Sequence, residues 1–163
     1  MKFCSANNNT TKKPTLQTMT KKFVIDSCVF MKLFLEEEND EIAEKLITEA
    51  AKNHDLIYVP NIFIYEVSSI IANKNLDMKQ VFSILEKYKK STLKIIDPDS
   101  HLLIKAIEMA RGGNAKSGYP AVYDSIYHAL AIENNCTFIT SDIKHYTKSK
   151  KFGFIKLLKE YEK

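Results

Sequence analysis

The chain has 163 residues, of which 45% are hydrophobic and 27% are charged, and its formal net charge at pH 7 is +4. This length indicates one domain with a buried core, and no apolar run is long enough to cross a bilayer, so we expect a soluble cytoplasmic protein without a membrane segment. Three widely spaced cysteines, Cys4, Cys28 and Cys136, exclude a disulfide framework and a zinc knuckle. Cys28 and Cys136 stand among apolar residues and are expected as small core side chains.

The positive charge is unevenly distributed. Residues 1–22 hold five lysines and no acid, so the other 141 residues carry a net charge of −1. Overall basicity is therefore poor evidence for nucleic-acid binding. Residues 143–163 contain seven lysines and two glutamates, and this basic segment could guide a polyanion or form a solvated helix face.

Residues 1–21 are rich in Asn, Thr and Lys and lack periodicity, so we expect a disordered extension before a folded domain at residues 22–163. Translation could also begin at Met19, just before the first apolar segment. Short apolar segments predict strands at 22–25, 56–59, 93–96 and 137–140, with a fifth near 154–158.

Helical periodicity predicts the intervening elements. Asp77 is expected as an N-cap and Pro120 as a residue of the first turn of the last helix. The predicted helical segments are 28–35, 39–53, 62–74, 77–90, 100–111 and 120–134. Short apolar strands that alternate with helices are typical of an α/β fold, here a three-layer α/β/α sandwich with a central parallel sheet of four to five strands.

Two of these strands end near an aspartate. Asp26 follows the apolar run in "FVIDSCVF", and Asp142 closes "TFITSD". Each could be a helix cap or one wall of an acidic pocket. Parallel strands end at one edge of the sheet, where open α/β folds bind their ligands. Glu66 and Asp124 lie near the starts of helices that begin at this edge, so four acids are expected to converge there.

Converging carboxylates repel one another unless a cation is present. Mg²⁺ or Mn²⁺ suits such a set, because both are hard ions that prefer oxygen ligands. Taken singly, Glu66 and Asp124 could also be favourable charges at helix N-termini. Asp97, which follows the third predicted strand, is interpreted as a residue that forms a turn.

Four segments in this order, "VIDSCVF", "IYEVSSII", "YDSIYHALA" and "FITSD", resemble the motifs of PIN-domain nucleases, and more narrowly of VapC-like toxins of type II toxin–antitoxin systems. The resemblance covers about residues 22–160. It implies an α/β/α sandwich and metal-dependent endoribonuclease activity. It also implies catalytic roles for Asp26, Glu66, Asp124 and Asp142, with the three aspartates holding Mg²⁺ or Mn²⁺, and a role for Ser141 in orienting a ligand or phosphate.

The same resemblance implies RNA as substrate, a cognate antitoxin as partner and a homodimer. The antitoxin's tail would cover the active-site groove, and the helices at 39–53 and 77–90 could supply an apolar dimer surface. Further residues are candidates for contacts with the RNA. Lys144 and Lys148, with Lys150 and Lys151, could hold phosphates, and the rings of Tyr123, His145 and Tyr146 could stack on bases or simply pack. His128 is interpreted as a half-buried structural histidine.

Other classes of protein were weighed. A phosphatase of the haloacid dehalogenase type would need a second aspartate where Cys28 stands, and a phospho-receiver would need an acidic pair at the first strand. A dinucleotide-binding domain would need glycines after that strand, and "DSCVF" has none. A non-catalytic RNA-binding PIN-like domain and a DNA-directed nuclease remain open alternatives.

Overall fold

The computed structural model describes residues 20–161. The expected disordered extension and the alternative start at Met19 therefore lie outside the described residues. Within this range no helix is long and apolar enough to cross a membrane.

A five-stranded sheet forms the centre of the molecule. Its strands pair in the order β3-β2-β1-β4-β5, and every pair is parallel. All five strands are short, and the three inner ones, β1, β2 and β4, are largely buried, as expected for a sheet covered on both faces. All five predicted strands are present, as β1 (Lys22–Ile25), β2 (Leu56–Pro60), β3 (Leu93–Ile96), β4 (Thr137–Thr140) and β5 (Ile155–Leu157).

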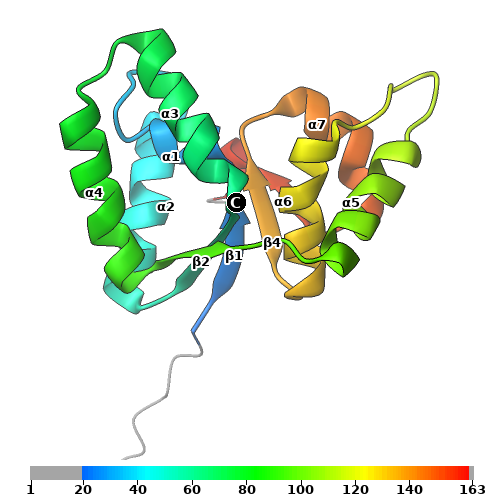
Figure 1. Ribbon diagram of the computed structural model, residues 1–163, viewed down its shortest axis with the longest axis horizontal. Coiled ribbons are helices and arrows are strands. Elements are labelled where there is room, and N and C mark those ends of the chain that lie inside the picture. Colours follow the sequence, from blue (N-terminus) through cyan, green and yellow to red (C-terminus); the bar gives the residue numbers. More distant parts are fainter. Residues whose placement is uncertain (1–19, 162–163) are drawn as a thin grey trace, which may run out of the picture.

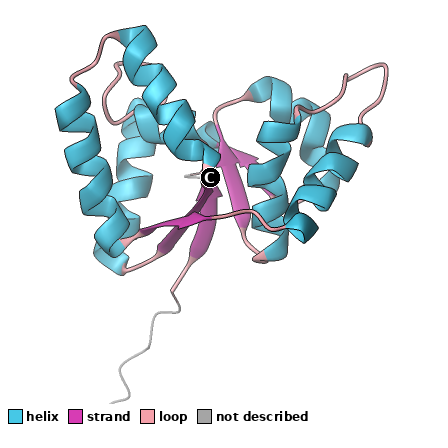
Figure 2. Ribbon diagram, viewed as in Figure 1, coloured by secondary structure: helices cyan, strands magenta, loops and turns pink. Residues whose placement is uncertain are grey.

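Helices cover both faces of this sheet. Figure 1 places α2 and α4 on one side and α5 and α6 on the other, and Figure 2 shows the strands enclosed between them. The predicted three-layer α/β/α sandwich is thus confirmed. The helices are α1 (Ser27–Met31), α2 (Asp40–Asn53), α3 (Ile62–Lys74), α4 (Met78–Ser91), α5 (Ser100–Arg111), α6 (Val122–Glu133) and α7 (Ile143–Ser149), with 3-10 turns η1 (Lys150–Phe152) and η2 (Leu158–Glu160).

Two helix starts show how local chemistry sets these bounds. Asp77 caps α4 by accepting the amide hydrogens of Lys79 and Gln80, as predicted. The expectation for Pro120 was wrong. The helix α6 begins at Val122, because Ala121 has an extended backbone (φ −71°, ψ 145°) and ends the loop before the first turn.

The helix α6 is the most deeply buried one. Seven consecutive residues, 125–131, are buried, so the helix is enclosed on all sides over two turns. It packs on α5 and against β1, β2 and β4. The ring of Tyr127 stacks on Phe138 of β4 with centroids 5.9 Å apart. This packing fixes the N-terminus of α6, and with it Asp124, relative to the ends of the strands.

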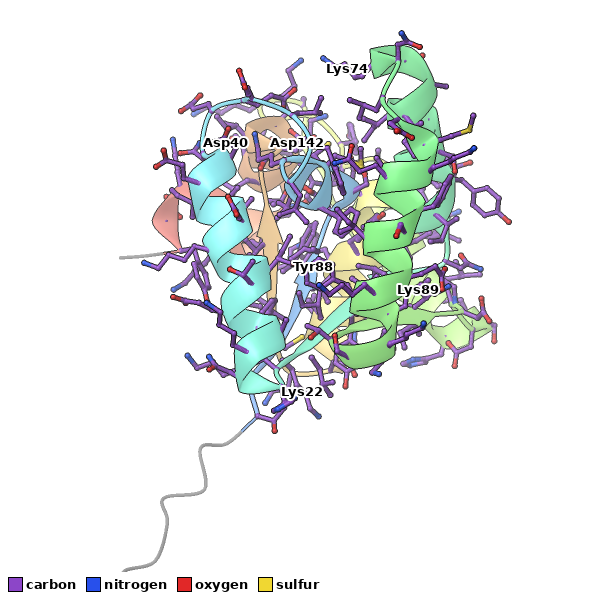
Figure 3. All side chains as sticks on the ribbon, turned by 90° about the vertical axis from the view of Figure 1, so that its left-hand side faces the viewer. Lys22, Asp40, Lys74, Tyr88, Lys89 and Asp142 are labelled. Atoms are coloured by element: carbon purple, nitrogen blue, oxygen red, sulfur yellow. The ribbon has the colours of Figure 1, made fainter. Side chains whose placement is uncertain are left out.

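The topology also determines where a ligand can approach. From β1 the chain extends the sheet through β2 and β3 on one side and then returns to β4 on the other side of β1. A crevice forms at the carboxyl ends of the two strands where the winding changes direction, here β1 and β4. Figure 3 shows Asp142, just beyond β4, at the end of the molecule opposite Lys22, the first residue of β1.

Candidate active site

Asp26 is the first residue after β1 and uses both carboxylate oxygens. Its Oδ1 accepts the amide hydrogen of Val29 at 2.7 Å and so caps α1, while its Oδ2 accepts the hydroxyl hydrogen of Thr140 at 2.5 Å. The two interpretations of this residue, helix cap and pocket wall, are therefore compatible.

The surroundings of Asp26 shift its pKa in opposing directions. The pKa of this carboxyl is raised to about 6, chiefly by burial and also by the charge of Glu66, against the opposing hydrogen bonds from Thr140 and the backbones of Val29 and Ser141. A carboxylate with such a pKa is ionised at neutral pH but gains from any cation that approaches it.

Thr140 connects the two acids that follow neighbouring strands. It is buried, donates to Asp26, and accepts the amide hydrogen of Asp142 at 2.9 Å. Sequence reasoning selected the next residue, Ser141, whose hydroxyl oxygen is buried without a hydrogen-bond partner in the described structure. The alternation of side chains along β4 carries the signal that could have identified Thr140, because residues two apart face the same way.

Asp142 caps α7. Its Oδ1 accepts the amide hydrogens of Lys144 at 2.7 Å and His145 at 3.0 Å. Asp142 was expected to be the partner of Asp26 across the site. Thr140 is hydrogen-bonded to both residues, and the acid whose charge raises the Asp26 pKa is Glu66.

Glu66 lies in the second turn of α3 and accepts the hydroxyl hydrogen of Tyr127 at 2.5 Å through Oε2. Burial and the adjacent Glu66 raise the pKa of Tyr127, so its hydroxyl stays protonated and remains a donor. Tyr127 was not identified from the sequence, because an aromatic residue in an apolar helix looks like core. Its ring is part of the hydrophobic core, and its hydroxyl belongs to the candidate site because it donates to Glu66.

Asp124 stands in the first turn of α6. Its pKa is raised to about 6, chiefly by burial and also by the charges of Asp142 and Glu66, while the charge of Lys148 opposes this rise. Electrostatic coupling therefore links the four predicted acids in a chain, with Asp26 coupled to Glu66, Glu66 to Asp124, and Asp124 to Asp142. The structure brings all four to one edge of the sheet, from β1, α3, α6 and β4.

The chemistry of these donors fits a hard divalent cation. All four are carboxylates, and the pKa values of Asp26 and Asp124 are raised by burial and by neighbouring carboxylates. Among residues 20–161, no group of three or more His, Cys, Asp or Glu side chains could hold a metal ion as the side chains stand. The donor type nevertheless suits an ion such as Mg²⁺, whose ligands are carboxylates, waters and substrate phosphates.

Cys28 and His128 differ from their sequence expectations, and for His145 the packing alternative holds. Cys28 is exposed at the surface rather than part of the core, although partial burial of its thiol, together with the charges of Asp26 and Glu66, raises its pKa to about 12. His145 is 2% exposed, so its ring is not available to stack on a base. His128 is fully buried rather than half-buried, and its Nε2 donates to the carbonyl of Gly153 at 2.6 Å.

The lysines near the site have different surroundings. Lys148 lies close enough to Asp124 to lower the pKa of that carboxyl, and Lys144 is exposed at the start of α7. Lys151 donates to the carbonyl of Gly112, the residue that ends α5, and Lys150 lies 6.0 Å from the ring centroid of Tyr146. Lys144 and Lys148 are thus the lysines best placed beside the acids.

Two cavities lie near this end of the molecule. One of about 110 Å³ is lined by residues that include Lys32, Thr140 and Ser141. A larger one of about 460 Å³ lies between α2, α4 and the segment after α1. None of the four acids lines either cavity, and the smaller one is connected to them only through Thr140, which donates to Asp26.

Known structures share this fold. The chain resembles PAE2754 from Pyrobaculum aerophilum with a TM-score of 0.58 and 16% identity over 86% of this chain and 93% of that one. It resembles VapBC2 from Rickettsia felis, bound to a DNA fragment from their promoter, with a TM-score of 0.61 and 20% identity over 83% and 96%. For VapC20 from Mycobacterium tuberculosis, a toxin that cleaves the sarcin–ricin loop, the TM-score is 0.60 and the identity 10% over 81% and 95%.

At these identities the likeness concerns the fold alone, and no curated protein matched the chain. The family model for the PIN domain matches residues 23–151, which include all four acids. This match spans most of the chain and agrees with the sheet order and the position of the acids at its carboxyl edge. The chain therefore belongs to the PIN domain family.

Proposed function

We propose that this protein is a metal-dependent endoribonuclease that cleaves RNA phosphodiester bonds and acts as the toxin of a toxin–antitoxin pair. Membership of the PIN domain family supports nuclease activity. The observation that carries the proposal is the convergence of Asp26, Glu66, Asp124 and Asp142 at the point where the sheet changes its winding direction.

The metal, Mg²⁺ or Mn²⁺, would be held by Asp26, Asp124 and Asp142. When bound, such an ion supplies a water of lowered pKa and neutralises charge on the scissile phosphate. Asp26 and Asp124 are suited to this role because carboxyls with pKa values of about 6 are ionised at neutral pH. A bound cation would stabilise their negative charge.

The protein groups then have separate tasks. Tyr127 fixes Glu66 through Oε2, so Oε1 is free to accept a hydrogen bond from the attacking water and to hold it in line with the phosphorus. Thr140 holds Asp26 and the Asp142 backbone in register. Lys144 and Lys148 bind phosphates flanking the cleaved bond, and Ser141 offers a hydroxyl beside them. Attack by water leaves 5′-phosphate and 3′-hydroxyl ends.

The partners follow from the toxin assignment. The similar structure from Rickettsia felis contains VapBC2 with promoter DNA, which supports a cognate antitoxin for this chain as well. Such a partner would cover the acids and exclude RNA. A homodimer is proposed for the free protein, and sedimentation of the purified chain tests it directly.

Two readouts test the proposed activity. End-labelled RNA and a single-stranded DNA of the same sequence are incubated with the protein and Mg²⁺ or Mn²⁺, and a parallel sample contains EDTA. We expect cleavage of RNA, its loss with EDTA, and 5′-phosphate ends on the products. Cleavage of the DNA alone would identify a DNA-directed nuclease, and binding of RNA without cleavage under every metal condition would identify a non-catalytic RNA-binding domain.

A further inference from the structure

A group of buried polar atoms lies directly behind the acids. It comprises Nδ1 of His128, both ring nitrogens of His145 and the hydroxyl oxygen of Ser149, and none of these atoms has a hydrogen-bond partner among the described residues. His145 and Ser149 come from α7 and His128 from α6. The two imidazole rings meet edge to face, with centroids 5.8 Å apart.

These nitrogens need an explanation because unpaired buried polar groups are destabilising. A buried donor or acceptor without a partner costs about 1–3 kcal/mol. The rings around His145 are those of His128 and Phe138, each 5.8 Å away. For packing alone, a phenyl ring of similar size would fill this site without that cost.

The bonding of His128 fixes its own role. Its Nε2 must carry the hydrogen that it donates to the Gly153 carbonyl at 2.6 Å. Burial lowers the pKa of His128, so the ring is neutral and its Nδ1 is a bare acceptor. His128 therefore faces α7 with an acceptor and has no hydrogen to offer the acids.

His145 is different because it contacts two acids through different atoms. Its backbone amide donates to Asp142 at 3.0 Å, and its ring Nδ1 lies 3.9 Å from Oδ2 of Asp124. The ring is 1% exposed, whereas Asp124 is 42% exposed and opens to solvent. A carboxylate beside Nδ1 favours the tautomer that carries hydrogen on this nitrogen, since a bare lone pair there would face negative charge.

We propose that His145 is a positioning residue that orients the carboxylate of Asp124 through its Nδ1–H group. Oδ2 is the carboxylate oxygen near the ring, 3.9 Å from Nδ1, and an interaction there would leave Oδ1 available to the site. The role toward a metal rests on the proposed function. Residues that orient a metal ligand in this way change metal affinity by about 10- to 100-fold when they are removed.

Metal binding without RNA gives the first test. His145→Phe keeps the ring and removes both nitrogens, whereas His145→Asn retains an amide donor near the position of Nδ1. Calorimetry with Mn²⁺ should show affinity about tenfold weaker for His145→Phe than for the wild type, and His145→Asn within about threefold of it. In an Asp124→Asn background, His145→Phe should have no further effect.

The second test measures the tautomer of the His145 ring, so it needs neither a metal ion nor a folded His145→Phe variant. Long-range ¹H–¹⁵N NMR spectra report which nitrogen of His145 carries the hydrogen. We expect hydrogen on Nδ1 in the wild type and a shift toward the Nε2–H tautomer in Asp124→Asn. Thermal melting should show that the two His145 variants remain folded.

Each outcome bears on a different claim. If the wild type binds Mn²⁺ and His145→Phe binds it equally well, or if hydrogen is on Nε2 in the wild type, the positioning role is wrong while the proposed function stands. Equal losses in the Phe and Asn variants would also overturn the role, since they would show a need for the ring and not for its donor. Absence of Mn²⁺ binding by the wild type overturns the proposed function and the role of His145 with it.

Discussion

Thr140 donates its hydroxyl hydrogen to Asp26 at 2.5 Å, between residues 114 apart in the sequence. The bond crosses from the end of β4 to the end of β1, which pair directly in the sheet. The bond therefore connects Asp26 to β4, the strand that directly precedes Asp142.

Thr140→Val tests the bond itself. Valine keeps the shape but removes both the donor to Asp26 and the acceptor of the Asp142 amide hydrogen. We expect a loss of about 1–3 kcal/mol in unfolding free energy by urea denaturation, and an Asp26 pKa above about 6 in NMR titrations. Thr137→Val, at the start of the same strand, is the matched control, and an unchanged Asp26 pKa would contradict the role of Thr140.

Tyr127→Phe separates packing from chemistry at the same site. The ring should stay stacked on Phe138, while Glu66 loses the hydroxyl that donates to it at 2.5 Å. We expect RNA cleavage to slow by about tenfold or more, with a change in unfolding free energy of about 1 kcal/mol or less. Cleavage at the wild-type rate would show that orientation of Glu66 by Tyr127 is not needed.

Asp26 should make the protein less stable as pH rises. Its native pKa of about 6 exceeds the ordinary value of 3.8, so between these values the folded state binds more protons than the unfolded state. Stability from this group is therefore greatest below about pH 4 and is lost as pH rises through 6, by up to about 3 kcal/mol. Urea denaturation from pH 4 to 7 without divalent ions measures this change.

Asp26→Asn is the control for that pH series, because asparagine still caps a helix but does not ionise. The decline of stability between pH 4 and 6 should shrink in this variant. A decline of equal size in Asp26→Asn would show that another group causes it.

Much of this architecture could be predicted from the sequence, since strands buried on both faces are continuously apolar and helices between them are amphipathic. The placement of the four acids followed from topology, because every strand of a parallel sheet ends at the same edge. The family resemblance was confirmed by the match to the PIN domain model.

The remaining features depend on side-chain directions that the sequence pattern does not encode. Thr140 and Tyr127 look like ordinary strand and core residues until the fold brings Asp26 and Glu66 to them. Cys28 looks apolar by its neighbours, but a five-residue helix exposes one of its faces. His145 looks like a surface residue of a lysine-rich helix, but α7 turns it inward.

Lys148 should contribute to RNA binding through charge alone. It lies beside Asp124 in a segment rich in lysine. If it contacts one phosphate, Lys148→Ala should weaken RNA binding and reduce the slope of log affinity against log salt by about 0.7. Lys87→Ala, an exposed lysine on α4, is the matched control. Equal salt slopes for wild type and Lys148→Ala would remove Lys148 from the RNA-binding surface.

The most direct measurement is the rate at which Asp124→Asn cleaves end-labelled RNA in the presence of Mg²⁺. Asp124 is the informative acid because, unlike Asp26 and Asp142, it caps no helix, so the variant should fold with wild-type stability or better. We expect cleavage to fall to the level of a wild-type sample treated with EDTA, with an unchanged circular dichroism spectrum. Cleavage at the wild-type rate by the folded variant would contradict an active site built on these four acids.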